Sequence, residues 1–85
     1  MNILHNVRLN KFYVQNHMDC HLTYELKGQV CIVKHTFVQE ELRGQKIAYE
    51  LASKIYHWAK QNHFIIQSEC SYMTTWLKRY SHISK

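Results

Sequence analysis

The chain has 85 residues, of which 46% are hydrophobic and 20% are charged, with two glycines and no proline. This composition is that of a globular protein and excludes collagen-like, low-complexity and repeat proteins. Lys and Arg number 11 against 6 Asp and Glu, which gives a formal net charge of +5 at pH 7. That charge suits an anionic partner, which could be nucleic acid, a membrane surface or a phosphorylated small molecule, although it could also serve solubility alone.

The length predicts a single domain over residues 1–85. A domain of this size buries only about 60–65% of the surface of its unfolded chain, so its core must be compact. The N-terminal residues lack the apolar run of a signal peptide, and no stretch approaches transmembrane length. We therefore expect a cytoplasmic protein with no membrane partner.

Cysteine and histidine invite a metal or disulfide hypothesis. Cys20, Cys31 and Cys70 are odd in number and form no CxxC pair, which argues against a disulfide framework and a Cys-rich zinc site. Cys31 and His35 would share a face of one strand, but nothing nearby completes a ligand set. We expect reduced thiols and no metal site.

The first third of the chain predicts two antiparallel strands. The apolar side chains lie at odd positions in residues 7–9 and at even positions from Phe12, so one unbroken strand would turn its apolar face over midway. We therefore expect a loop near residues 6–10 and a strand over Lys11–Gln15, followed by a turn at His17–Asp19. Regular alternation over Cys20–Leu26 then predicts a half-buried strand.

The centre of the chain predicts a hairpin and a buried strand. Gly28 accepts a positive φ and can close the hairpin. The return strand, Gln29–Val38, is apolar on both faces, so we expect it at the centre of the sheet with a cover on each side.

The second half predicts a helix, a strand and a helix. Ile47, Leu51 and Ile55 lie at helical spacing within a helix expected over Gln45–Gln61. Phe64–Ile66 follows as a short strand parallel to the earlier one. The last helix is expected to begin at Ser71, a candidate N-cap, and residues 81–85 are expected to form a frayed tail.

This order predicts an α/β fold in which two helix N-termini meet the ends of neighbouring strands. One helix begins after Arg43-Gly44 and the other after Cys70. Unpaired N–H groups and the helix dipole make such termini anion sites, and strand ends are the usual place for a ligand in α/β folds. We expect the functional site there.

Three segments of the chain carry a family resemblance. Residues 43–48, Arg-Gly-Gln-Lys-Ile-Ala, resemble the Arg/Gln-x-x-Gly-x-Gly/Ala pyrophosphate motif of the GCN5-related N-acetyltransferases. His-Thr-Phe-Val at residues 35–38, and Cys-Ser-Tyr within residues 69–77, are similar to signatures of the small, minimal branch of that superfamily. The resemblance runs from Phe12 to Tyr80 in matching order. Lys46 departs from the motif, which has Gly at that position.

The resemblance implies a minimal acetyltransferase-like fold: a mostly antiparallel sheet, one parallel strand pair at the cofactor cleft, and helices on both faces. It implies that acetyl-CoA binds between the strand that ends at Val38 and the strand that ends near Cys70. The cofactor-binding residues that it implies are Thr36, Phe37, Val38, Arg43, Gly44, Gln45, Lys46, Ile47, Ala48, Ser71 and Tyr72. The larger members carry helices between the first two strands, for which His17–Asp19 leaves no space, so the acceptor side should be open or completed by another chain.

Cys70 is the candidate catalytic residue. The helix N-terminus and nearby cationic groups would favour its thiolate, which could accept acetyl and pass it on, although a buried structural thiol and direct transfer are alternatives. Val38 N–H is the family's candidate donor to the thioester oxygen. His35 and Glu69 are candidate bases by type, and Tyr72 could contact the ligand or protonate the departing thiolate.

Three functions are carried forward. The first is an acetyl-CoA-dependent acyltransferase acting on an unidentified amine, on a small molecule or a protein. The second is a non-catalytic CoA-binding or protein-interaction module. The third is a small basic nucleic-acid-binding domain, which the scattered positions of Lys and Arg support least. The sequence leaves the oligomeric state open.

Overall fold

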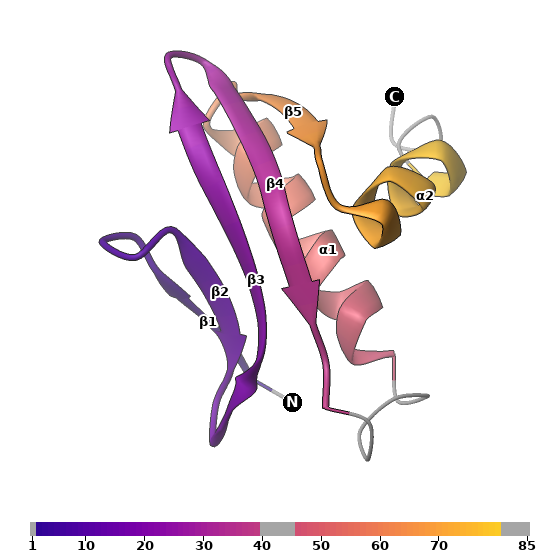
Figure 1. Cartoon of the computed structure of the whole chain (residues 1–85). Coiled ribbons are helices and arrows are strands. Elements are labelled where there is room, and N and C mark those ends of the chain that lie inside the picture. The colour runs from indigo at the N-terminus through magenta and orange to yellow at the C-terminus, as the bar shows by residue number, and fades with distance from the viewer. Residues whose placement is uncertain (1, 40–45, 81–85) are drawn as a thin grey trace.

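The computed structural model describes residues 2–39 and 46–80, in which five strands and two helices follow one another (Figure 1). In chain order they are β1 (Ile3–Asn6), β2 (Lys11–Val14), β3 (His17–Lys27), β4 (Val30–Phe37), α1 (Ile47–Gln61), β5 (Ile65–Ser68) and α2 (Ser71–Tyr80). None of the helices in this part of the chain has the length and apolar character needed to cross a bilayer. Residues 40–45, for which part of the phosphate-binding segment and the start of the first helix were predicted, and residues 81–85, for which a tail was predicted, lie outside the described ranges.

The strands form one sheet in the order β1-β2-β3-β4-β5, which is also their order in the sequence. The first three pairings are antiparallel and the β4–β5 pairing is parallel. Helix α1 is the crossover between the two parallel strands, as such a pair requires. The predicted α/β fold, with a mostly antiparallel sheet and one parallel pair, is confirmed.

Two sequence predictions near the N-terminus were wrong. Ile3–Asn6 forms an additional strand, β1, that a four-residue segment without alternation did not reveal. His17–Asp19 is not a turn but the start of β3, because the chain reverses one residue earlier, at Asn16 with φ 68°. Asn tolerates this left-handed conformation better than most residues.

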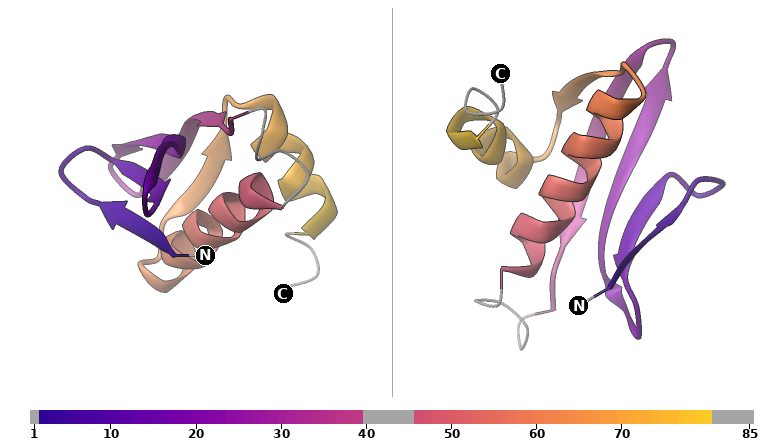
Figure 2. Two further views of the ribbon diagram at one scale, coloured as in Figure 1. Left: turned by 90° about the horizontal axis from the view of Figure 1, so that it is seen from below. Right: turned by 180° about the vertical axis from the view of Figure 1, so that it is seen from behind.

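The core lies on one face of the sheet, beneath both helices. Leu22, Cys31 and Val33 of the strands, Leu51 of α1 and Met73 of α2 are fully buried in one cluster. The aromatic rings of Trp76 in α2 and Tyr56 in α1 lie 5.3 Å apart. The expectation of helices on both faces is therefore corrected: α1 and α2 share a face, as the views in Figure 2 allow the reader to follow.

The opposite face of the sheet carries exposed apolar residues. Phe37 is 40% exposed and Ile65 59% exposed. Ile32 is still buried there, between Glu25 of β3 and Gln67 of β5 in the register. The double-sided apolar pattern of β4 thus correctly predicted an interior strand, which pairs with β3 and β5, but β4 is the fourth of the five strands and no second helical layer covers it within the described residues.

Candidate active site

The candidate site that the motifs indicate lies where β4 and β5 separate. Their last aligned residues are Val33 and Ser68, and the Glu69 N–H donates to the Val33 carbonyl at 2.8 Å. Beyond this point β4 continues to Phe37 in register with β3, while the segment that follows β5 turns into α2 (Figure 1). The end of β4 is therefore paired on its β3 side and faces the start of α2 on the other.

An irregularity in β4 sets which residues face this opening. Tyr24 of β3 aligns with Val33 but Thr23 aligns with His35, so Lys34 is an extra residue on β4. An extra residue of this kind exchanges the two faces of the strand that follows. Before the extra residue, side chains at odd positions such as Val33 face the core; after it, side chains at even positions do, beginning with Thr36.

The register also turns the backbone of Thr36 toward the opening. The Tyr24 N–H donates to Asn10 at 3.0 Å, so Tyr24 faces β2 and its neighbours in β3 face β4. His35 and Phe37, which align with Thr23 and His21, therefore direct their peptide groups to β3. Thr36, between them, directs its own peptide groups away from β3.

Thr36 and Cys70, which are 34 residues apart in the sequence, are in direct contact. The Cys70 thiol donates to the Thr36 hydroxyl, with Sγ and Oγ1 3.5 Å apart. Both side chains are partly buried. The contact brings together two of the three segments on which the family resemblance rests.

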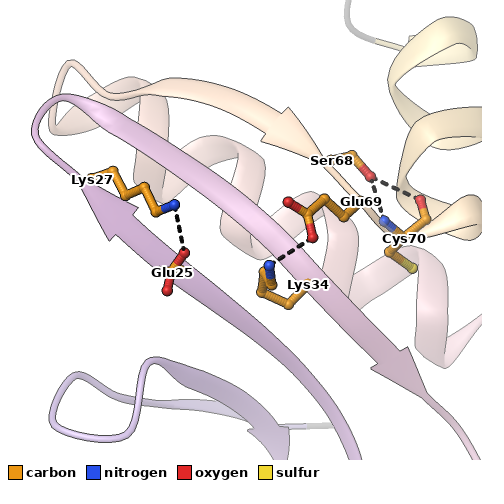
Figure 3. A network of polar contacts seen from close by, with 6 residues as sticks. All are labelled: Glu25, Lys27, Lys34, Ser68, Glu69 and Cys70. Carbon is orange, nitrogen blue, oxygen red and sulfur yellow. Dashed lines mark hydrogen bonds and ion pairs between the residues drawn. The ribbon is translucent and has the colours of Figure 1, made fainter.

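A hydroxyl cluster positions Cys70 at the start of α2 (Figure 3). The Ser68 hydroxyl accepts from the Cys70 N–H at 3.1 Å and donates to the Cys70 carbonyl at 2.8 Å. The Thr74 hydroxyl donates to Ser68 Oγ at 3.0 Å, and the Thr74 N–H donates to the Cys70 carbonyl at 2.9 Å. Cys70 thus occupies the capping position, and Ser71, the expected N-cap, is the first helical residue.

The role of Ser68 was missed in the sequence. A signal was available, because a Ser hydroxyl often bonds the backbone two residues further along the chain, which here is Cys70, the residue before the helix. The apolar pattern drew attention instead to the strand that Ser68 ends.

An exposed ion pair joins β4 to the residue that follows β5, at the point where the two strands separate. Lys34 Nζ lies 2.6 Å from Glu69 Oε1 (Figure 3). The hydrogen bond from Lys34 lowers the pKa of the Glu69 carboxyl, and the same bond raises the pKa of Lys34. Glu69 is therefore a weaker base than a free carboxylate.

His35, the other candidate base, lies on the opposite face of β4 from the Thr36–Cys70 contact. It aligns with Thr23, and its ring centre is 6.1 Å from that of His21. The structure thus does not bring His35 together with the thiol. Among the residues it describes, no three His, Cys, Asp or Glu side chains are grouped so that they could hold a metal ion.

The N-terminus of α1 begins in an unusual conformation. Lys46, exposed and just before the helix, has φ 61° and ψ 25°, and its carbonyl accepts the Glu50 N–H at 3.0 Å. This is the left-handed region that a Gly enters without steric cost, and it is the position at which the family motif has Gly. Ile47 is buried and Ala48 partly buried, while predicted Arg43, Gly44 and Gln45 lie outside the described residues.

The remaining predicted residues flank the opening. Val38 is 8% exposed, beyond the end of β4. Ser71 is exposed, and Tyr72, 39% exposed, follows it in the first turn of α2. Burial first, and then the nearby Tyr80 and Tyr49, raise the pKa of Tyr72, so that its phenol stays protonated at neutral pH.

Comparisons with known proteins agree with this geometry. No curated protein gives a significant match. The NMR solution structure of a GCN5-like candidate N-acetyltransferase from Staphylococcus aureus superposes with a TM-score of 0.76 at 25% identity, covering 98% of this chain and 83% of that one. The family profile described as GCN5-related N-acetyl-transferase matches residues 11–85. The chain belongs to the GCN5-related N-acetyltransferase family.

Proposed function

We propose that this protein binds acetyl-CoA in the opening between β4 and the start of α2, and transfers the acetyl group to an amine. The observation that carries the proposal is the 3.5 Å contact between Thr36 and Cys70, where β4 and β5 part. Family membership supports the same chemistry.

The two walls of the opening suit the two ends of the cofactor. The first N–H groups of α1, after Lys46, form an anion site for the pyrophosphate, to which the Lys46 ammonium adds a charge. Arg43, Gly44 and Gln45 are the proposed partners on the preceding segment. The outward peptide groups of Thr36 suit the amides of the pantetheine arm, because an extended chain can pair there as a further strand would.

In direct transfer, the neutral amine attacks the thioester carbonyl, the C–S bond breaks, and the CoA thiolate takes up a proton. A free lysine amine has a pKa of about 10.4, so the acceptor must be deprotonated or desolvated before it attacks. Tyr72, protonated and partly exposed, is the proposed proton donor to the thiolate. Val38 N–H is the proposed donor to the carbonyl oxygen.

In the alternative route, Cys70 is the first nucleophile. Its thiolate attacks the thioester carbonyl, CoA leaves with a proton, and the amine then displaces the sulfur of acetyl-Cys70. Partial exposure distinguishes Cys70 from the fully buried Cys20 and Cys31. Burial raises the pKa of Cys31 to about 11, which keeps that thiol unreactive.

Thermal melting tests cofactor binding. Acetyl-CoA at about 100 times its Kd adds roughly 2.7 kcal/mol to the free energy of unfolding, which raises the Tm of so small a protein by on the order of ten degrees. Tyr72→Ala should reduce the shift, whereas His57→Ala, an exposed residue of α1 on the β1 side of the sheet, should not. The absence of any shift with CoA or acetyl-CoA would contradict the proposal, and salt-sensitive binding to RNA or DNA would then favour a nucleic-acid-binding domain.

Mass spectrometry under rapid quench separates the two routes. An acetyl-cysteine intermediate predicts an adduct of about 42 Da that is absent in Cys70→Ala. Turnover without that adduct supports direct transfer. Equal thermal shifts with CoA and acetyl-CoA, but no turnover on a panel of amines, would favour a non-catalytic CoA-binding module.

A further inference from the structure

A second concave surface lies far along the sheet from Cys70, between its β1 edge and α1. This groove has a volume of about 550 Å³, within the range of about 300–1,000 Å³ typical of ligand sites. Its lining includes Ile3 and His5 from β1, Phe12 from β2, and Lys54, His57 and Trp58 from α1. The right-hand view of Figure 2 shows β1 at the sheet edge on the side of α1.

The edge strand directs the peptide groups of alternate residues outward. The Gln15 N–H donates to the Asn2 carbonyl at 2.9 Å, so Asn2 faces β2. Because facing alternates along a strand, Leu4 also faces β2 while Ile3 and His5 face the open edge. The outward groups of Ile3 and His5 bond no other strand within residues 2–39 and 46–80.

The side chains of the same two residues line the groove, and that of His5 is held in place by its neighbours. The His5 ring stacks on Phe12, with ring centres 3.9 Å apart, and meets Trp58 edge-on at 4.7 Å. His5 Nε2 also shares a 2.5 Å hydrogen bond with the Tyr24 hydroxyl. Burial lowers the pKa of His5, so its ring is neutral at pH 7.

Backbone groups at an open strand edge, together with a groove beside it, are the two parts of a strand-addition site. An incoming strand pairs its backbone with the edge and places alternate side chains in the groove. Charge around this edge favours acidic side chains. Lys54 and one carboxylate, Glu50, line the groove. Two further cations flank the edge: Arg8 follows β1, and Lys11, which aligns with Asn6, lies on the face of the sheet away from the groove, with Nζ 6.0 Å from the centre of the Tyr13 ring.

We propose that the β1 edge and its groove bind an acidic, extended peptide segment of another protein by strand addition. An apolar side chain of the peptide packs on His5 and Trp58, and an acidic one faces Lys54. This site does not depend on acetyl-CoA, and its test does not use acetyl transfer. Peptide binding and cofactor binding can therefore fail separately.

The experiment selects binders from a library of short random peptides and follows each with the isotopically labelled protein by NMR. Strand addition predicts that bound peptide slows amide hydrogen exchange at Ile3 and His5 but leaves Leu4 unchanged, because the Leu4 N–H already faces β2. The selected peptides should be rich in Asp and Glu. Selection of no peptide, or exchange protection at Cys70 instead of β1, would overturn the proposal.

Two pairs of variants complete the test. Ile3→Pro removes an outward N–H, which an edge strand tolerates, and should weaken peptide binding at least about tenfold, whereas Ile3→Val should not. Lys54→Glu should weaken it about two- to fivefold, whereas Lys60→Glu, the same change outside the groove, should not. A Tm equal to that of the parent protein shows that each variant is folded. Unaltered affinity in Ile3→Pro, or a β1-mediated dimer of this chain by light scattering in place of peptide binding, contradicts the proposal.

Discussion

Lys46 holds a backbone conformation that its side chain opposes. With φ 61° it lies in the left-handed region, where a residue with a Cβ costs about 1–2 kcal/mol. The family motif has Gly at this position, and Gly adopts a positive φ without this cost. Lys46 holds the same kind of conformation and carries an ammonium group at the start of α1, beside the proposed anion site.

Replacing Lys46 by Gly should therefore stabilise the protein. Relief of the strain is offset by about 0.4–1 kcal/mol of additional disorder in the unfolded chain, so we expect the free energy of unfolding to rise by up to about 1 kcal/mol. Urea denaturation measures it. Lys46→Ala keeps the strain and removes only the amine, so a rise of the same size in Lys46→Ala would contradict this explanation.

The same two variants divide the contributions of Lys46 to acetyl-CoA binding. If the ammonium contacts the pyrophosphate, both variants lose affinity. If only the backbone matters, Lys46→Gly binds as well as the parent protein.

At the scale of elements, β4 and the segment that follows β5 are joined by the Lys34–Glu69 ion pair. Lys34 is the extra residue of β4, so the irregularity that turns Thr36 toward Cys70 also presents the lysine to Glu69. Both side chains are exposed, and the pair is therefore sensitive to pH and to salt.

We expect the stabilisation from this pair to be lost in acid. The pKa of Glu69 is lowered in the folded protein from its ordinary value of 4.5, so its contribution is present above that pH and disappears as the pH falls through the lower folded value. The pKa of Lys34 is raised above 10.5, so its contribution is lost only in strong alkali. The Tm difference between the parent protein and Glu69→Gln should shrink between pH 7 and about pH 3. A difference that grows in acid would have the wrong sign.

The sequence predicted most elements because their apolar periods were clear. The alternation in β3, the double-sided apolar run in β4 and the helical stripe of α1 each identified their element. Strand β1 has only Ile3 and Leu4 as adjacent apolar residues, and no period can be read from so short a segment. The irregularity at Lys34 was equally hidden, because it exists only in the register between two strands.

The motifs predicted that Thr36 and Cys70 lie close together, but not the geometry around them. They indicated that Thr36 and Cys70 flank one opening, and the two side chains are in contact. They did not indicate that Ser68 positions Cys70, or that His35 faces away from it. Those facts depend on local hydrogen bonds and strand register, which residue types alone do not determine.

At the scale of the whole molecule, one core supports both ends of the sheet. Leu51, in the second turn of α1, is fully buried in this core. Helix α1 packs on the β1 side of the sheet through Trp58 and on α2 through Tyr49 and Tyr56. The proposed cofactor site and the proposed peptide groove thus share one supporting helix.

Leu51→Ala should accordingly be severe. Removing a buried Leu side chain costs about 2–5 kcal/mol, out of a total stability of roughly 4–13 kcal/mol for a chain of this length. The Tm should fall by about 4–8 °C for each kcal/mol lost, as measured by circular dichroism. His57→Ala, on the exposed side of the same helix, should change stability by less than about 0.5 kcal/mol. A loss in Leu51→Ala no larger than that in His57→Ala would show that α1 is not the central support.

The strands lie in the sheet in the same order as in the sequence, and this affects the rates at which they pair during folding. Strands β1 to β4 join through short reversals, and each pairing closes only a small loop. The β4–β5 pairing instead needs the whole crossover through α1, and contacts distant in sequence are the slow ones to form. The two walls of the proposed active site should therefore meet late in folding. A cofactor that bridges them would act on the last step of assembly, and it should slow unfolding more than it speeds folding.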